Sequence, residues 1–326
     1  MLFRGKASEK DFTLESLPTT RREQFFDLFR HRFFFILSLG LILVLLAAPF
    51  FVAFTIKYFG VLSPASKQLS EEEYLAFYNT TLLIFDGFYA LCFIIFFIGL
   101  AGIGRIYRQL AWGENVSFAR DLFKGIKQNF LPYFVVGLMV GIMHFVCDLV
   151  MVFANTPFII YIPFAIECIV FPILLMVLSI VLIYQKPLVE TFGNAFIICL
   201  KRPFWTLLFV LFPLGISFLR YIPYPYVSLI VYFCLVIIVF PFFILAWYLF
   251  ALSSFDEYAN ASYYPDLYMK GLAIAFNDEA KEKTVIILAN AKAGNAITVN
   301  TNEDTVLYNK GEAPLKGAIN LKQEGL

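Results

Sequence analysis

Residues 105–130 read RIYRQLAWGENVSFARDLFKGIKQNF and form a basic stretch between two long apolar runs. The runs on either side, 77–104 and 130–154, are each long enough to cross a membrane as a helix, which needs about 20 mostly apolar residues. The stretch therefore connects two predicted membrane spans. Its charge matters because Lys and Arg are enriched in loops on the cytoplasmic side of a membrane. The cations of the stretch are Arg105, Arg108, Arg120, Lys124 and Lys127.

The composition is that of a membrane protein. Of 326 residues, 60% are hydrophobic and 15% are charged, whereas soluble domains have roughly 45–50% apolar and about 25% charged residues. The 40 Phe and 18 Tyr are typical of lipid-facing helices and of the membrane interface. Because the formal net charge is only +1, the chain has no overall basic field, and nucleic acid is not an expected partner.

Six apolar runs predict an all-α integral membrane protein with six transmembrane helices. They cover residues 33–57, 77–104, 130–154, 157–184, 204–222 and 226–252. We expect three parts in the chain: an N-terminal segment over 1–32, a membrane domain over 33–252 and a C-terminal tail over 253–326. The first run begins too late and is too long for the apolar region of a signal peptide, so it is expected to remain as a membrane anchor.

The distribution of Lys and Arg between the loops predicts the orientation. Basic residues concentrate before the first span, in the 105–130 stretch and in the loop after the fourth span. The alternate loops carry few of them: Lys57 and Lys67 stand beside an acidic run at 71–73, and the loop after the fifth span holds only Arg220. Both termini are therefore predicted to be cytoplasmic.

The tail over 253–326 differs from the rest of the chain because charged and small polar residues dominate it. TVIILANA at 284–291 and AITVN at 296–300 are short β-type runs on either side of KAGN, a turn-like stretch. A small hairpin and a loosely ordered tail both fit this pattern. The shortage of large apolar residues favours the loosely ordered tail, so we expect partial order at most.

The 105–130 stretch is predicted to contain an amphipathic helix that lies in the membrane interface. GEN is a turn signal, and Ser117 is a plausible N-cap for the helix that follows. Apolar residues then recur at helical spacing: Phe118, Leu122, Phe123, Ile126 and Phe130. Arg120, Lys124 and Lys127 fall on a different face. With Arg105 and Arg108 they are predicted to form a basic membrane surface that binds anionic headgroups.

The loop after the fourth span, KPLVETFGNAFIICLKRPFW at 186–205, has the same character and predicts a second interfacial helix. The two loops superpose with a constant offset, so that Phe118 matches Phe192 and Lys127 matches Lys201. Parallel repeats of this kind occur in some transporters. An ancient duplication without transport and the common pattern of helical hairpins explain the match equally well.

The run GIGRIYRQLAWGENVSFARDLFKGIKQNF at 102–130 resembles the signature of the YesL-type family of bacterial membrane proteins. The later element around Asn194, Ala195 and Lys201 is similar to the second half of that family, and the resemblance covers about residues 30–252. It implies a multi-pass protein of the bacterial plasma membrane. Because members are often encoded near carbohydrate-uptake genes, it also implies an accessory or structural component of a membrane assembly. The family has no established catalytic residues to carry over.

Four ionisable residues lie inside predicted spans: Asp86, His144, Asp148 and Glu167. At 1.5 Å per helical residue, Asp86 and Glu167 both lie about 15 Å from the same end of the bundle, with His144 near that level. His144 and Asp148 share a helix face at i and i+4. One interpretation is a cation or proton site, with these groups as metal ligands or as a proton relay. The other is a polar cluster that fixes the helices through hydrogen bonds.

The sequence contains no HExxH, GxSxG or P-loop motif. Its five cysteines lie in apolar runs without CxxC spacing, which disfavours both a disulfide framework and a thiolate metal site. We therefore predict a non-enzymatic protein without a cofactor. Its expected partners are anionic headgroups of the bilayer and either another membrane protein or a second copy of this chain. The leading interpretation is the accessory role, and the alternative is a cation- or proton-coupled secondary transporter.

Overall fold

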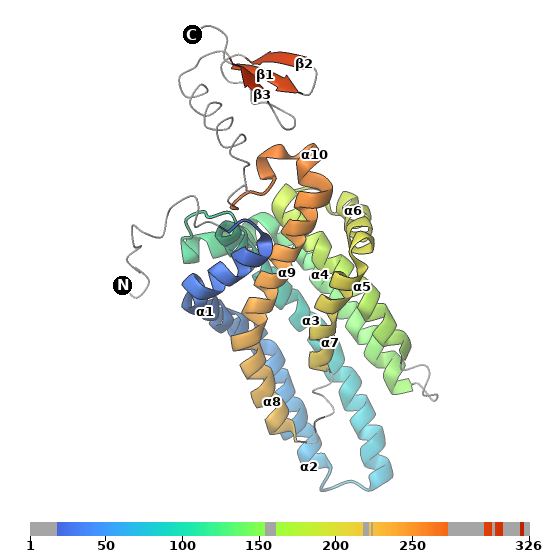
Figure 1. The fold of residues 1–326 in the computed structure, drawn as a ribbon. Coiled ribbons are helices and arrows are strands. Elements are labelled where there is room, and N and C mark those ends of the chain that lie inside the picture. The colour runs from blue at the N-terminus through green and yellow to red at the C-terminus, as the bar shows by residue number, and fades with distance from the viewer. Residues whose placement is uncertain are drawn as a thin grey trace. The chain divides into compact units, whose positions relative to one another are not determined.

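The computed structural model describes residues 18–153, 161–217, 222 and 224–272, together with strands at 297–301, 304–308 and 320–322. The chain divides into two compact units, one formed by residues 25–251 and the other by residues 1–24 with 252–326. The larger unit is a bundle of long helices (Figure 1).

The helices follow one another in chain order with short connections (Figure 1). They are α1 (Arg21–Thr55), η3 (Ile56–Leu62), α2 (Ser63–Ala65), α3 (Glu71–Ala111), α4 (Phe118–Phe153), α5 (Tyr161–Tyr184), α6 (Leu188–Lys201), α7 (Pro203–Ser217), α8 (Pro225–Cys234), η5 (Leu235–Val239) and α9 (Phe240–Phe255). Segments η3 and η5 are π-helical turns that continue α1 and α8. The predicted all-α polytopic membrane fold is confirmed.

Five continuous helical stretches in the described residues are long and apolar enough to cross a membrane. A sixth crossing exists only if α6 and α7, which bend by 101° at their junction, are counted as one span. The predicted span at 204–222 corresponds to α7, whose 15 residues extend only about 22 Å at 1.5 Å per residue. That is shorter than the roughly 30 Å of a hydrocarbon core. Of the predicted span, residues 218–221 lie outside the described residues.

Each of the two helices predicted to lie in the interface is separated from the following helix by one residue with non-helical backbone angles. In α4 this residue is Asn129 (φ −116°, ψ 17°), and between α6 and α7 it is Arg202 (φ −130°, ψ 55°). A third break occurs in α1 at Arg32 (φ −123°, ψ 16°). Pro132 and Pro203 follow two of these breaks, and proline removes a helical N–H donor. The order helix, break, outgoing helix, returning helix thus occurs three times, where the sequence predicted two copies.

Helix α5 is the most enclosed span, because every residue from Met176 to Ile183 is buried. Helices α3 and α4 pack closely against each other through small residues. An added Cβ would lie 2.6 Å from the Ala90 carbonyl oxygen at Gly141 and 3.0 Å from the Phe97 Cβ at Gly137. Gly137 and Gly141 form a GxxxG motif, which lets helix backbones approach closely in membranes. This contact fixes the distance between the two helices that carry Asp86, His144 and Asp148.

Replacing Gly141 by leucine is expected to destabilise the bundle by about 1–3 kcal/mol, because the side chain must push α4 away from the α3 backbone. Gly193→Leu on α6 is the matched control, since an added Cβ there meets nothing within 4 Å. Thermal unfolding of the purified protein in detergent, followed by size-exclusion chromatography, compares the two variants. Equal melting temperatures for both would contradict the close α3–α4 contact.

The smaller unit contains η6 (Asp256–Asn260), α10 (Ala261–Tyr263), η7 (Pro265–Leu267) and three strands (Figure 1). The strands are β1 (Ile297–Thr301), β2 (Asp304–Tyr308) and β3 (Asn320–Lys322), in the antiparallel order β2-β1-β3. Strand β1 falls on the predicted AITVN run, and its partners come from later in the chain. The TVIILANA run at 284–291 lies outside the described residues.

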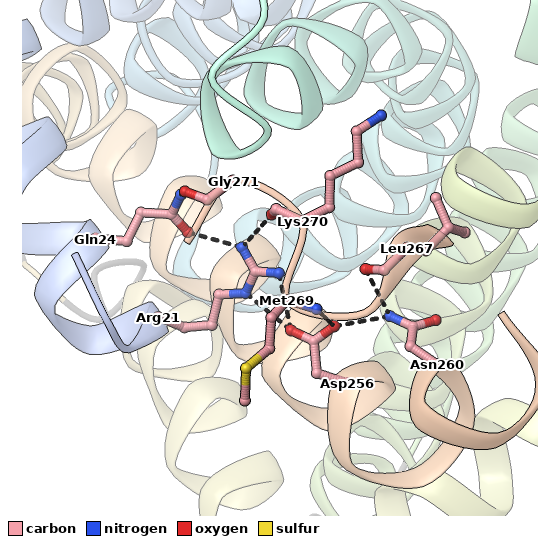
Figure 2. Close-up of polar contacts among 8 residues, drawn as sticks. All are labelled: Arg21, Gln24, Asp256, Asn260, Leu267, Met269, Lys270 and Gly271. Carbon is pink, nitrogen blue, oxygen red and sulfur yellow. Dashed lines mark hydrogen bonds and ion pairs between the residues drawn. The ribbon is translucent and has the colours of Figure 1, made fainter. Parts of the chain in front are cut away.

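A buried polar network ties the start of α1 to the segment after α9 within the smaller unit (Figure 2). The Arg21 guanidinium donates two hydrogen bonds to one Asp256 oxygen, at 3.0 and 2.8 Å, and a third to Gln24. The other Asp256 oxygen accepts from the Asn260 amide and from the Met269 backbone N–H. Both charges are buried, and their hydrogen-bonding groups have partners. The network is therefore structural.

Candidate functional site

His144 lies between two carboxylates in the middle of the helical bundle. Its Nε2 atom is 3.3 Å from an oxygen of Asp148, one turn further along α4. Its Nδ1 atom is 3.5 Å from an oxygen of Glu167 on α5. The predicted convergence of His144, Asp148 and Glu167 is therefore present. Phe93 of α3 packs edge-on against the imidazole, with ring centroids 5.4 Å apart, and holds it between the two acids.

This arrangement requires an additional proton. A neutral imidazole has one N–H donor and one nitrogen lone pair. With ionised carboxylates on both sides, the lone pair would face a negative oxygen across one of the two contacts. The contacts are both favourable only when His144 is doubly protonated or when Asp148 or Glu167 carries a proton. A proton shared among the three side chains would make both contacts favourable.

Asp86 on α3 forms a second buried ion pair with a residue that the sequence placed in a loop. Lys57 Nζ lies 3.6 Å from an Asp86 oxygen, and both side chains are buried. The ammonium also lies 5.4 Å from the ring centre of Tyr89 and 5.5 Å from that of Tyr58, within cation–π range. Lys57 belongs to the π-helical turn η3, and such turns often mark functional positions in helices.

The Lys57–Asp86 pair and the three side chains around His144 form one electrostatic cluster, since the charge of Asp86 interacts with those of Asp148 and His144. The five side chains include three carboxyl groups, one ammonium and one imidazole. If His144 is protonated and the carboxylates are ionised, the cluster carries a net charge of −1. If His144 is neutral and the proton lies on Asp148 or Glu167 instead, the net charge is again −1. In either state the cluster is electrostatically suited to a cation.

A cavity of about 290 Å³ opens beside this cluster, and His144 and Glu167 line one end of it. His144 keeps 26% of its side chain accessible, so the imidazole faces the cavity rather than being packed over. Helices α3, α4, α5 and α9 supply the rest of the wall. Nine of the twenty lining residues are Phe, Tyr or Trp: Phe93, Phe96, Phe97, Tyr133, Phe171, Phe240, Phe243, Trp247 and Tyr248.

The cluster is not arranged as a metal centre. In the described residues, no group of three or more His, Cys, Asp or Glu side chains has the geometry to hold a metal ion. His144 uses both ring nitrogens on carboxylates, which leaves neither nitrogen directed at a common ligand position. The geometry thus supports the proton-relay form of the sequence hypothesis and gives no support to the metal-ligand form.

The predicted basic membrane surface needs a correction. Arg105 and Arg108 lie near the end of α3 and are buried, each with 9% of its surface exposed. Arg105 donates to the Gln128 side chain at 2.8 Å and pairs with Asp121 at 3.6 Å. Arg108 donates to the Leu182 carbonyl at 2.9 Å. These two cations therefore hold α3 against α4 and α5 and are not available to headgroups.

The other cations of the predicted surface, Arg120, Lys124 and Lys127, are exposed on the first turns of α4. Phe123 stands among them with 69% of its surface exposed. The predicted apolar face is divided. Leu122 packs against Gly102 of α3, while Phe123 points outward beside the cations. The exposed apolar face is thus smaller than predicted, and Phe123 stands on it beside the three cations.

The fold and the site define a polytopic α-helical membrane protein with an ionisable cluster beside an aromatic cavity. Comparison of the chain with protein families, with curated proteins and with solved structures found no match. The resemblance to the YesL-type family therefore stays an expectation from the sequence. The cluster and the cavity are therefore the features of the molecule that bear on its function.

Proposed function

We propose that this chain is a non-enzymatic, proton-coupled membrane transporter. The observation that carries the proposal is that His144, held between Asp148 and Glu167, borders the cavity inside the bundle. Ionisable groups inside membrane helices are costly, and they commonly mark proton relays or substrate pathways. A cluster that only held the helices together would have no need to line the cavity. The predicted alternative function is thus the one that the geometry supports best.

The proposed coupling follows from the charge of the cluster. A proton on the His144–Glu167 contact and a cation in the cavity both neutralise the same negative charge. Each therefore weakens the binding of the other, and by linkage the effect is reciprocal. Exchange of one for the other at a single site is the simplest way to couple two gradients. No bond is made or broken, which is consistent with the lack of enzyme motifs in the sequence.

The proposal includes the orientation predicted from the loops. Exposed Arg120, Lys124 and Lys127 belong on the cytoplasmic side by the positive-inside rule, with both termini on that side of a bacterial plasma membrane. Phe123 among them suits a position in the headgroup layer. The accessory role in carbohydrate uptake stays an expectation of the family resemblance, since no feature of the described residues singles out a protein partner.

The test is a pH step applied to proteoliposomes on a solid-supported membrane. The wild-type protein is expected to give a transient current between pH 5 and 8, the range in which imidazole groups commonly change charge. His144→Gln and Glu167→Gln should each reduce the transferred charge at least tenfold. His31→Gln is the matched control, because His31 is exposed and pairs with Asp27 outside the cluster. A wild type without current, or a His144→Gln variant with full current, would contradict the proposal.

A further inference from the structure

We propose that the cavity binds an organic cation with an apolar body, such as an aryl or alkyl quaternary ammonium ion. The inference rests on the proposed function in that it names the substrate class for the same site. It is carried by three properties of the cavity: its aromatic wall, the acid at one end and the buried cation beyond the other end.

The aromatic wall supplies the first argument. Nine aromatic side chains surround a space of about 290 Å³, close to the lower limit of small-molecule sites. Faces of aromatic rings attract cations, and cages of such rings recognise quaternary ammonium groups. A neutral aliphatic ligand would not need a wall of aromatic rings, because a wall of branched aliphatic side chains would serve it equally well. The wall therefore favours a ligand that is both apolar and positively charged.

Glu167 supplies the second argument, because it places a carboxylate at one end of this wall. Its side chain is largely buried, with 15% accessible, and reaches both His144 and the cavity. Phe171 lies one helical turn further along α5 and also lines the cavity, so the acid and the ring share a face. An ammonium group at this end would contact the carboxylate and ring faces together. An anion would meet a cluster with net negative charge.

Arg108 supplies the third argument, because it fixes the direction of the ligand. Gly104 and Leu182 line the cavity at the end away from Glu167, and the Arg108 guanidinium is bonded to the Leu182 carbonyl. Tyr133 and Tyr248 line the same end of the cavity. A cationic head is repelled from this end and attracted to Glu167. A dication that extended along the whole cavity is disfavoured.

The binding experiment compares two water-soluble probes with the same aromatic body. Benzyltrimethylammonium carries a cationic head and phenylmethanesulfonate an anionic one. Isothermal titration calorimetry on the purified full chain in neutral detergent should show at least tenfold tighter binding of the cation. Glu167→Gln should weaken that binding at least tenfold. Glu190→Gln is the matched control, because Glu190 is an exposed acid on α6 and does not line the cavity.

A second variant guards against misfolding of Glu167→Gln. Phe171→Leu keeps the charge of the cluster and removes one ring face, and a cation–π contact contributes about 0.5–2 kcal/mol. Binding of benzyltrimethylammonium should therefore fall about 2-fold to 30-fold, with a normal size-exclusion profile. Equal affinity for the two probes, no binding of the cation at millimolar concentration, or unchanged binding in a folded Glu167→Gln variant would each overturn the inference.

The outcomes separate this inference from the proposed function. A pH-step current without binding of benzyltrimethylammonium would overturn the substrate class and leave proton coupling intact. Binding of the cation without any current would leave the ligand site standing and overturn transport. Competition between protons and the organic cation would link the ligand site to proton coupling. If one site serves both, lowering the pH from 8 to 5 should weaken binding of the cation, and affinity that stays constant across this range would contradict a shared site.

Discussion

Arg21→Ala is expected to speed hydrogen exchange at the Met269 amide by roughly 10²–10⁴-fold. The Met269 N–H donates to Asp256 at 3.1 Å, and the Asp256 carboxylate is held by Arg21 (Figure 2). Removing one partner of a buried ion pair leaves an uncompensated charge, which costs about 3–5 kcal/mol. Local opening free energies of that size are read directly from exchange rates. Hydrogen exchange followed by mass spectrometry covers the segment from Asp256 to Gly271.

Two comparisons make this experiment decisive. Arg22→Ala removes the neighbouring cation, which is exposed, and should leave the exchange rate unchanged. The double variant Arg21→Met with Asp256→Leu replaces the pair by apolar side chains and should recover much of the lost protection, because no charge is left buried alone. An Arg21→Ala rate equal to that of Arg22→Ala would show that the network does not hold this segment.

The membrane fold was predictable because hydrophobic length is a direct physical requirement of a bilayer. Apolar runs around Asp86 and Glu167 had to become helices, since lipid offers no partner for free backbone groups. The breaks were harder to foresee. Pro203 marks the break at Arg202, because the residue before a proline is disfavoured in the helical region. The first proline after Arg32 is Pro49, too far along the helix to mark the break, which therefore has no signal in the local sequence.

The candidate site was predictable to the extent that residues at the same depth in neighbouring helices come into contact. Counting residues from the ends of the spans put Asp86, His144 and Glu167 near one level, with Asp148 on the helix face of His144. The structure brings His144 against Asp148 and Glu167 and pairs Asp86 with Lys57. Lys57 was missed because it stands at the very end of the predicted first run and was counted as a loop cation. The signal was the sequence YFGVL directly after it, which extends the apolar run to Leu62 and places Lys57 inside the helix.

Whether Arg105 and Arg108 are buried or exposed was not predictable from the 105–130 stretch alone. Arg105 and Arg108 stand shortly before the GEN turn, where cations on an exposed helix end would also be expected. They are buried because α3 continues as a helix to Ala111 and α4 folds back along it. Their partners, Gln128 and the Leu182 carbonyl, lie on α4 and α5. Only the packing of three helices decides which face of α3 is enclosed.

Lys57→Met is expected to destabilise the protein by about 3–5 kcal/mol, because it leaves the Asp86 carboxylate buried without its counter-charge. Asp86→Leu alone should cost a similar amount by leaving the ammonium unpaired. The double variant Lys57→Met with Asp86→Leu removes both charges and should recover most of the loss. Thermal unfolding in detergent measures all three variants, and a strictly additive double variant would contradict direct pairing.

The same double variant assigns the pair its role in the cluster. Lys57 and Asp86 neutralise each other, and neither lines the cavity, so proton exchange is assigned to His144 and Glu167. The double variant should therefore keep the pH-step current of the wild type within about twofold, although its charge pair is gone. His144→Gln, with the pair intact, should lose the current at least tenfold. If the double variant also lost its current while remaining folded, Asp86 would belong to the proton path, and the exchange site would extend from α5 through α4 to α3.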